Sequence, residues 1–370
     1  MSSITSSFAT PICESDSFVP AKSSTPERGQ EQRDFHYSYS ESLPSILAGL
    51  KSSLLITTYT TGNLVAVSQQ EGRIVPSFHT FDRPMGVAAK ENGIAVGTRH
   101  QVWFLRSAPD IAVKLEPRGQ FDAAFLTRHS HYTGDIHCHD LAWVGNELWI
   151  VNTLFSCLCT MHPEYNFAPR WKPPFVSALV AEDRCHLNGL AAADGKPRFV
   201  TAMAETDSKQ SWRAVKKTAG CVIDVASGTT IVRGLTMPHS PRLANGQLYF
   251  LHSGLGHLET LDPTNGHREV VCELPGYTRG LSIVGSLAFV GLSKVRLASD
   301  WDGVPIAKHP DQLKCGVWVI DLKSGNVAGR FEFLTGAGEL FDVQLLPGVS
   351  HPFLSGPLED NPLWTVKPLR

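Results

Sequence analysis

Histidines recur at one register of a repeated segment. Each segment contains a Leu-Ala pair, and the three align on that pair: IHCHDLAW (136–143), RCHLNGLA (184–191) and MPHSPRLA (237–244). In this alignment His137, His186 and His239 fall in one column. Histidines at the same register of a repeated strand point at one place in space, and convergent imidazoles are what a transition-metal centre requires.

Side chains two residues further along each strand face the same side, because strand side chains alternate with period two. This second position adds His139 to the column. Neutral imidazoles suit Fe, Cu or Zn, whereas Mg and Ca prefer oxygen ligands. We therefore predict a divalent transition metal, with Fe preferred and Cu or Zn next, held by His137, His139, His186 and His239.

The same two positions in the other repeats supply catalytic and substrate-binding candidates. Glu339 could be a fourth ligand, an acceptor for an imidazole N–H or a general base. Arg279 or Arg83 would hold a carboxylate or phosphate, and Asn188 and Tyr277 would line the same site. Histidines from adjacent repeats leave one side of an ion open, so oxygen-dependent oxidation of a small-molecule or peptide substrate is the preferred chemistry. Metal-assisted hydrolysis or elimination comes next.

A non-catalytic alternative uses the same residues. Inner-strand histidines can serve as hydrogen-bond partners that join neighbouring repeats or hold a small ligand or peptide. This hypothesis predicts no stoichiometric metal, whereas the metalloenzyme hypothesis predicts an open coordination site.

Six copies of the repeat position these residues. Weaker copies of the opening strand are RPMGVA (83–88), YTRGLS (277–282) and ELFDVQ (339–344). Each opening is followed by further β-rich runs, and repeats of roughly 40 to 50 residues with four strands indicate a β-propeller. The copy at the C-terminus has a first strand only, while the N-terminal SLLITTYTTG (53–62) reads as a second strand without a first. We predict an all-β, six-bladed propeller whose last blade is closed by N-terminal strands pairing with the C-terminal strand.

The chain ends differ from the repeats. Residues 1–34 are rich in Ser, Thr, Pro and Glu, a composition that predicts a disordered tail. A short helix and lead-in is expected over 35–52, the propeller over 53–348 and a C-terminal extension over 349–370. A polar insertion, AETDSKQSWRAVKK (204–217), is long enough to cover one face of the propeller, and its Trp212 and Arg213 are candidates for substrate binding.

Composition sets limits on partners. The 370 residues carry a formal net charge of −2, which gives no basic footprint for nucleic acid. No apolar run reaches membrane-spanning length, and the N-terminus lacks the apolar stretch of a secretory signal, so no membrane association and a cytoplasmic location are expected. None of the eight cysteines forms a CxxC pair, so free thiols are expected. The sequence makes no prediction of oligomeric state.

Long segments of the chain, among them GDIHCHDLAW, EDRCHLNGLA and CGVWVIDL, resemble a bacterial family of conserved hypothetical proteins. Some of its members are joined to tetratricopeptide repeats. The resemblance spans roughly residues 50 to 350 and implies the propeller fold, but no activity. A looser similarity is to the carotenoid-cleavage oxygenases, in which four blades supply four histidines to an axial iron; here the candidates come from three blades.

Overall fold

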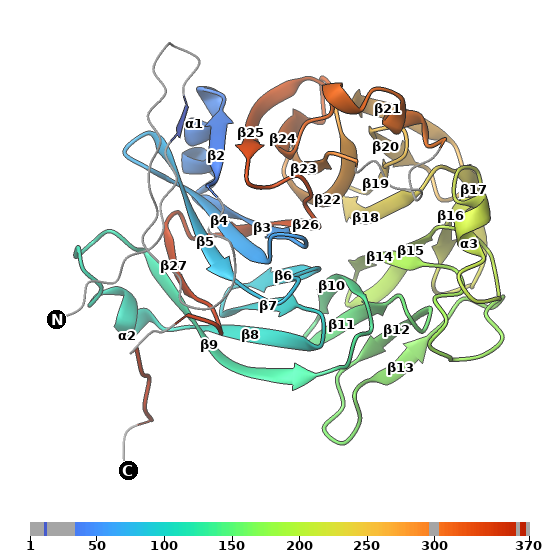
Figure 1. Cartoon of the computed structure of the whole chain (residues 1–370), viewed down its shortest axis with the longest axis horizontal. Helices are drawn as coiled ribbons and strands as arrows, with labels where there is room; N and C mark the ends of the chain where they lie inside the picture. The colour runs from blue at the N-terminus through green and yellow to red at the C-terminus, as the bar shows by residue number, and fades with distance from the viewer. Residues whose placement is uncertain (1–10, 13–33, 296–302, 360–362, 368–370) are drawn as a thin grey trace.

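The computed structural model describes residues 11–12, 34–295, 303–359 and 363–367. Six β-sheets stand around a central axis as the blades of a β-propeller, as the repeats predict, and the four core strands of each blade are antiparallel (Figure 1). Blades 2 to 5 each contain four strands that follow one another in the chain from the axis outward.

The strands of the blades have the following bounds. Blade 1 contains β6 (Val87–Lys90), β7 (Gly93–Gly97), β8 (Gln101–Ser107) and β9 (Ala123–Tyr132). Blade 2 contains β10 (Cys138–Val144), β11 (Glu147–Asn152), β12 (Cys157–Thr160) and β13 (Ala168–Trp171). Blade 3 contains β14 (Leu187–Ala193), β15 (Lys196–Ala202), β16 (Gly220–Asp224) and β17 (Thr230–Leu235). Blade 4 contains β18 (Pro238–Ala244), β19 (Gln247–His252), β20 (His257–Leu261) and β21 (Arg268–Glu273). Blade 5 contains β22 (Tyr277–Val284), β23 (Leu287–Ser293), β24 (Gly316–Asp321) and β25 (Val327–Thr335).

Blade 6 closes the ring with strands from both ends of the chain. Its innermost strand, β26 (Asp342–Pro347), pairs antiparallel with β3 (Ser52–Thr58). The sheet then continues through β4 (Asn63–Gln70) to β5 (Arg73–Thr80). The predicted closure is therefore confirmed, and it joins the first and last repeats through a ladder of backbone hydrogen bonds.

Segments outside the repeats add to the rim. The strand β27 (Pro352–Ser355), from the predicted C-terminal extension, pairs parallel with β9. The strand β2 (His36–Tyr39) pairs with β25 and β1 (Pro11–Ile12) pairs with β2, while the helix α1 (Ser42–Leu50) packs against β25 and β4. Apart from β1 and Asp34, the predicted tail lies outside the described residues. The short helices are α2 (Pro109–Ala112), α3 (Trp212–Val215), η2 (Pro305–Lys308) and η3 (Pro310–Gln312).

Local sequence explains the tight hairpins between inner strands. Asn245 and Gly246 both have positive φ, 53° and 75°, and join β18 to β19. Asp194 and Gly195 do the same between β14 and β15, with φ of 52° and 67°. Two-residue turns with positive φ at both positions match the twist of the strands that they connect, and Asn-Gly and Asp-Gly favour them.

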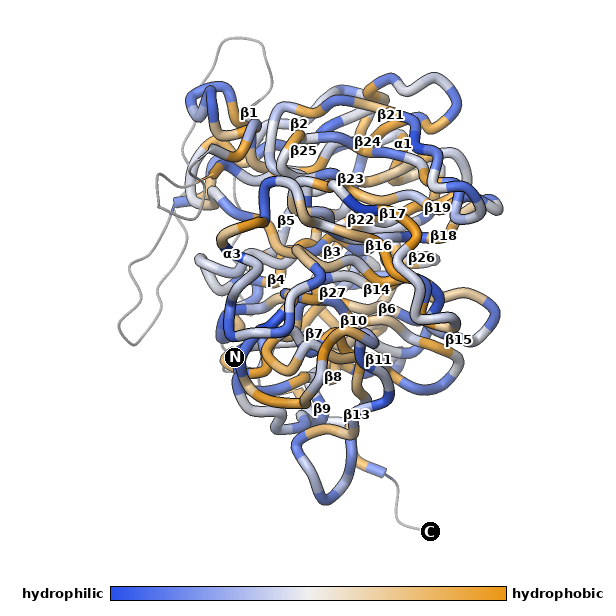
Figure 2. The backbone as a smooth tube through the Cα atoms, turned by 90° about the vertical axis from the view of Figure 1, so that its right-hand side faces the viewer, coloured by the Kyte–Doolittle hydropathy of each residue, from blue (hydrophilic) through white to orange (hydrophobic). Residues whose placement is uncertain are grey.

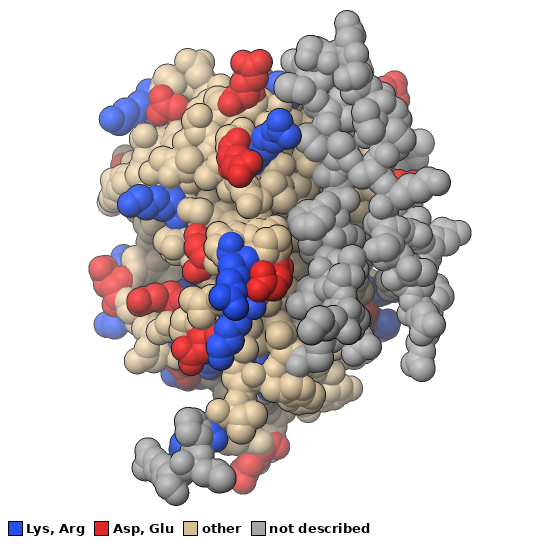
Figure 3. All heavy atoms as spheres, turned by 90° about the vertical axis from the view of Figure 1, so that its left-hand side faces the viewer, with Lys and Arg blue, Asp and Glu red and all other residues tan. Residues whose placement is uncertain are grey.

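The hydrophobic core lies between adjacent blades. One cluster joins Val151 and Leu158 of blade 2 to Leu190 and Val200 of blade 3, and similar clusters follow around the ring. In the side view of Figure 2 hydrophobic stretches follow the strands and hydrophilic stretches gather in loops at the edge. On the face in Figure 3 acidic and basic side chains are interspersed. No helix in the described part of the chain is long and apolar enough to span a membrane.

Candidate functional site at the channel mouth

The backbone marks an equivalent position just before the inner strand in four of the blades. The residues there have a left-handed φ of 48° to 54°: Arg83, His137, His186 and Met237. A left-handed backbone is uncommon for residues other than glycine, so its recurrence identifies structural counterparts. Met237, and not His239, is therefore the counterpart of His137 and His186.

The predicted alignment is wrong by two residues in blade 4. His239 is instead the counterpart of His139, since each places Nδ1 near the carbonyl oxygen two residues earlier. The sheet register agrees, because Cys138 and Pro238 occupy equivalent positions opposite Asn152 and His252. The Leu-Ala pair of blade 4 comes two residues later than in blades 2 and 3, so counting back from it misplaces the histidine.

Two rings of side chains therefore surround the propeller axis at the end where the inner strands begin. We call this end the channel mouth. The inner ring consists of Met85, His139, Asn188, His239, Arg279 and Phe341. The outer ring consists of Arg83, His137, His186, Met237, Tyr277 and Glu339. The alignment of the repeats agrees with these positions except in blade 4, where it put His239 at the outer position that Met237 occupies.

The inner-ring histidines are held by their Nδ1 atoms. His139 Nδ1 lies 3.1 Å from the His137 carbonyl oxygen and 2.9 Å from Thr153 Oγ1. The Thr153 hydroxyl donates its own hydrogen to the Leu187 carbonyl, so it accepts from the imidazole. His139 Nδ1 therefore carries a hydrogen, and in the neutral ring the lone pair is on Nε2.

His239 repeats this arrangement in blade 4. Its Nδ1 lies 3.0 Å from the Met237 carbonyl oxygen and 3.0 Å from Ser253 Oγ. Burial, first, and the neighbouring Arg279 charge lower the pKa of His139 well below its ordinary value. Burial, followed by the Arg279 charge, has the same effect on the pKa of His239. Both rings are therefore neutral near pH 7, with an acceptor at Nε2.

A buried carboxylate orients His186. Asp183 Oδ2 accepts hydrogen bonds from His186 Nδ1 at 2.9 Å and from Trp212 Nε1 at 3.1 Å. The Trp212 ring also packs against the imidazole, with centroids 4.1 Å apart, so the predicted insertion 204–217 reaches the mouth. Asp183 and His186 both have positive φ, a strained conformation that is often found at functional sites. Sequence reasoning missed Asp183, whose signal is a carboxylate three residues before the histidine.

The His186 ring contacts the His139 ring edge to face, with centroids 4.8 Å apart. No described residue makes a hydrogen bond to Nε2 of His139, His186 or His239. His137 lies apart from them: its side chain is 40% exposed and its Nε2 is 3.8 Å from Asp135 Oδ1. Three of the four predicted histidines thus have Nδ1 engaged and Nε2 without a hydrogen-bond partner among the described residues.

A guanidinium lies in the same ring. The Arg279 Cζ atom is 3.4 Å from the centroid of Phe341, and Nη1 is 3.9 Å from Glu339 Oε1. Glu339 also accepts a hydrogen bond of 2.5 Å from Thr60. Although burial lowers the pKa of Arg279, an arginine remains charged near pH 7. The two predicted catalytic residues are therefore neighbours. Arg279 is on blade 5, next to the blade of His239, and Glu339 is on blade 6, across the axis from the blade of His186.

The remaining predicted residues lie at different depths. Arg83 is exposed and reaches the Tyr59 hydroxyl at 3.5 Å. Tyr277 is buried, with its hydroxyl 3.4 Å from His239 Nδ1, and burial raises its pKa. Arg213 Cζ lies 4.5 Å from the Trp212 ring. Arg83 and Tyr277 thus belong to the outer ring, and Arg213 belongs to the insertion.

Asn188 is a buried member of the inner ring with an unused donor. Its Oδ1 accepts a hydrogen bond of 2.7 Å from Thr201, but its Nδ2 is buried and has no partner among the described residues. Buried amide groups without partners are rare in folded proteins, and a bound water, ion or ligand commonly explains them. The inner ring thus contains an amide donor and a cation together with the acceptor nitrogens of His139 and His239.

A second group of histidines lies in blade 4, away from the inner ring. Within the described ranges, the one group of three or more His, Cys, Asp or Glu with ligand atoms all within 4.8 Å of one another is His252, His257 and Glu259. His252 donates from Nδ1 to Glu259 at 2.7 Å and accepts from the Thr236 N–H at Nε2. Arg268 neutralises Glu259 at 2.8 Å. Both nitrogens of His252 are engaged, so this group is a structural network.

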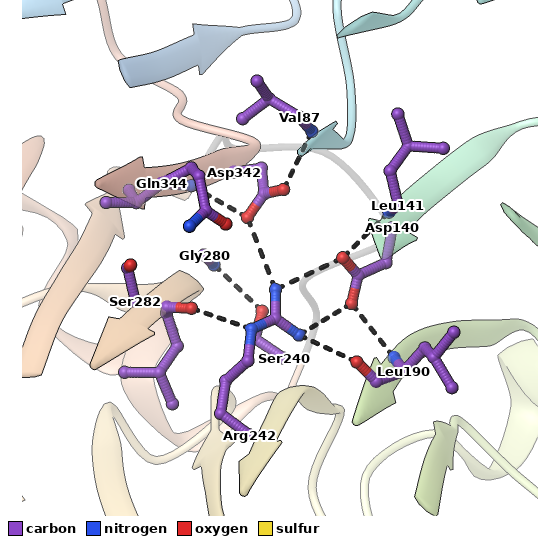
Figure 4. A network of polar contacts seen from close by, with 12 residues as sticks. Val87, Asp140, Leu141, Leu190, Ser240, Arg242, Gly280, Ser282, Asp342 and Gln344 are labelled. Carbon is purple, nitrogen blue, oxygen red and sulfur yellow. Dashed lines mark hydrogen bonds and ion pairs between the residues drawn. The ribbon is translucent and has the colours of Figure 1, made fainter. Parts of the chain in front are cut away.

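A network of charged groups lies between the inner strands at the propeller axis (Figure 4). Arg242 of blade 4 lies between Asp140 of blade 2, at 2.9 Å, and Asp342 of blade 6, at 3.9 Å. Asp140 and Asp342 directly follow the inner-ring residues His139 and Phe341 in the sequence. The channel is therefore crossed by side chains immediately below the histidines.

These features define a six-bladed β-propeller with a polar, histidine-lined channel mouth. The chain belongs to the family described as "Domain of unknown function (DUF4915)", whose profile matches residues 41–354. No curated protein matches the chain in sequence. A similar solved chain comes from the "Crystal structure of Nidogen/Laminin Complex", at 12% identity and a TM-score of 0.49, over 80% of this chain and 99% of that chain.

Proposed function

We propose that the channel mouth binds a small organic acid that also carries hydroxyl or amino groups. The observation that carries this proposal is the tethering of three imidazoles through Nδ1, which leaves their Nε2 acceptors beside the Arg279 guanidinium. Arg279 would hold the carboxylate, as guanidinium groups commonly do. The neutral imidazoles of His139 and His239 would accept hydrogen bonds from hydroxyl or amino groups, and Asn188 Nδ2 would donate one.

A metalloenzyme is the second candidate. It is favoured by the same Nδ1 tethers, because metal-bound histidines usually donate their other nitrogen to a carbonyl or carboxylate. His139, His186 and His239 would then bind Fe, with Cu or Zn next, and dioxygen-dependent oxidation would be the preferred chemistry. This candidate ranks second for two reasons. In the described residues these nitrogens are not gathered within 4.8 Å of one another, and a metal cation would oppose the nearby guanidinium.

One experiment separates the two candidates. Protein purified without a metal-binding tag is analysed for bound metal, before and after anaerobic reconstitution with Fe(II), and is titrated calorimetrically with L-malate, citrate, D-gluconate and L-glutamate. The variants are His186→Ala and Arg279→Gln, and the control is His267→Ala, whose side chain is 68% exposed on blade 4. Organic-acid binding that Arg279→Gln abolishes, without metal, supports the first candidate.

Bound metal that His186→Ala removes and His267→Ala retains supports the second candidate. If the wild type binds neither metal nor any of these acids, the proposal for the channel mouth is wrong. Thermal unfolding of each variant shows that a loss of binding is not a loss of fold.

A further inference from the structure

A cleft of about 490 Å³ lies between blades 1 and 2, away from the channel mouth. Blade 1 lines it with Lys90, Phe104, Arg106 and His129, and blade 2 with Trp143 and Glu147 among others. Lys90 ends β6 and Trp143 is near the end of β10, so the cleft is at the far end of the inner strands from the histidines. Its volume falls in the range of roughly 300 to 1,000 Å³ that is usual for small-molecule sites.

The charged side chains that line this cleft have a net positive charge. Lys90 Nζ lies 3.6 Å from the centroid of the Trp143 ring, and Arg106 Cζ lies 5.9 Å from that of Phe104. Neither cation has a carboxylate partner among the described residues. The carboxylate of Glu147 is bound by Arg170 of the same blade at 2.7 Å. An anion entering the cleft would therefore meet two uncompensated cations.

Aromatic rings form the other part of the lining. His129 stacks on Phe104 with ring centroids 4.6 Å apart and an interplanar angle of 13°. The indole Nε1 of Trp143 is buried without a hydrogen-bond partner among the described residues. Partial burial, followed by the Arg106 charge, lowers the pKa of His129, so its ring is neutral near pH 7. A flat ring can pack against these groups while its charged substituent meets the cations.

We propose that this cleft binds a planar aromatic anion of about the size of a nucleoside monophosphate. Its phosphate or carboxylate lies between Lys90 and Arg106, and its ring packs on Trp143 and on the exposed His129 ring, which itself stacks on the buried Phe104. The site is separate from the channel mouth and does not depend on the function proposed there.

The test is calorimetric titration of the full-length protein with AMP and with indole-3-acetate, which distinguish a phosphate from a carboxylate. Adenosine and inorganic phosphate are the controls for ring and anion alone. We expect a Kd below about 1 mM for AMP or indole-3-acetate, and weakening by about tenfold or more in Lys90→Gln and in Arg106→Gln. Lys323→Gln, an exposed position on blade 5, and His186→Ala at the channel mouth should bind as the wild type does.

Three results would overturn the proposal. These are no measurable binding of either aromatic anion, unchanged affinity in both cleft variants, or inorganic phosphate binding as tightly as AMP. Thermal unfolding of Lys90→Gln and Arg106→Gln checks that the blades remain folded.

Discussion

Arg242 on blade 4 donates a hydrogen bond of 2.9 Å from Nη1 to Oδ2 of Asp140 on blade 2, across the end of blade 3. Asp140 Oδ2 also accepts from the Leu190 N–H of blade 3 at 3.0 Å. On the opposite side Asp342 of blade 6 accepts from the Val87 N–H of blade 1 at 3.0 Å. Arg242 Nε also donates to the Leu281 carbonyl oxygen of blade 5 at 2.9 Å, so one guanidinium and two carboxylates connect all six blades at the axis (Figure 4).

Replacement of this arginine should be strongly destabilising. Arg242→Met leaves two carboxylates uncompensated in a buried site, and breaking a buried pair in this way costs about 3–5 kcal/mol of unfolding free energy. Urea unfolding measures the loss. The control is Arg118→Met, because Arg118 is 80% exposed and pairs with an exposed Glu116. Equal stability of the two variants would show that the axial network does not hold the blades.

The pH dependence of stability should report on Asp342. Burial, followed by the neighbouring Asp140 charge, raises the pKa of Asp342 from 3.8 to about 7. The folded protein therefore binds a proton that the unfolded chain releases. This contribution is complete below pH 3.8 and is lost as the pH rises through about 7. Asp342→Asn cannot titrate, so its stability relative to the wild type should improve as the pH rises across this window. Urea unfolding at a series of pH values tests this, and parallel curves would contradict it.

Glu259 should show the opposite dependence. Burial raises its pKa, but the hydrogen bonds from His252 and His257 outweigh burial and lower it from 4.5 to about 2. Its contribution to stability is present above pH 4.5 and is lost as the pH falls towards 2. Glu259→Gln should lower the unfolding free energy near pH 7 by about 1.5–3 kcal/mol. The difference from the wild type should shrink in acid, and a constant difference would rule out titration of this carboxylate.

The architecture could be read from the sequence because its signals are local. The hairpin turns Asp194–Gly195 and Asn245–Gly246 and the recurring apolar strands are visible without an alignment. Blade 6 was predictable because each end of the chain carries an incomplete repeat. The turns and strands depend on residues that are close together in the sequence, and the structure contains them at the predicted places.

The details of the site depend on contacts that a repeat does not encode. Pro241 takes the position that Leu141 and Leu190 occupy in blades 2 and 3, so the Leu-Ala pair of blade 4 is two residues out of register. Arg242 is separated by 102 residues from its partner Asp140, and its other partner, Asp342, begins β26 near the opposite end of the chain. No periodic pattern predicts such pairings, which exist only once the ring has closed.

The inner strands also approach each other too closely for an additional methyl group. A Cβ atom at Gly189 would lie 2.4 Å from Pro241 Cδ and 2.9 Å from the Ser240 nitrogen of the next blade. Gly189→Ala should therefore destabilise the protein by about 1–3 kcal/mol through overpacking. Gly49→Ala in α1 is the control, since a Cβ there meets nothing within 4 Å. It should be neutral or stabilising by up to about 1 kcal/mol. Similar melting temperatures for the two variants would show that blades 3 and 4 can separate at no cost.

The Asp183 carboxylate should fix the tautomer of His186. In the wild type Nδ1 lies 2.9 Å from Asp183 Oδ2, and in a neutral ring this hydrogen bond leaves Nε2 as the acceptor. Asp183→Asn keeps the size of the side chain, but its one oxygen must serve both Trp212 Nε1 and the imidazole. We expect a shift of the His186 hydrogen towards Nε2, which two-dimensional ¹H–¹⁵N spectra of the imidazole nitrogens detect without any ligand. Asp207→Asn, at an exposed carboxylate bound to Arg184, should leave those signals unchanged. An unaltered His186 tautomer in Asp183→Asn would mean that the carboxylate does not set the acceptor at the mouth, and that the hydrogen-bonding role proposed for this imidazole lacks its positioning group.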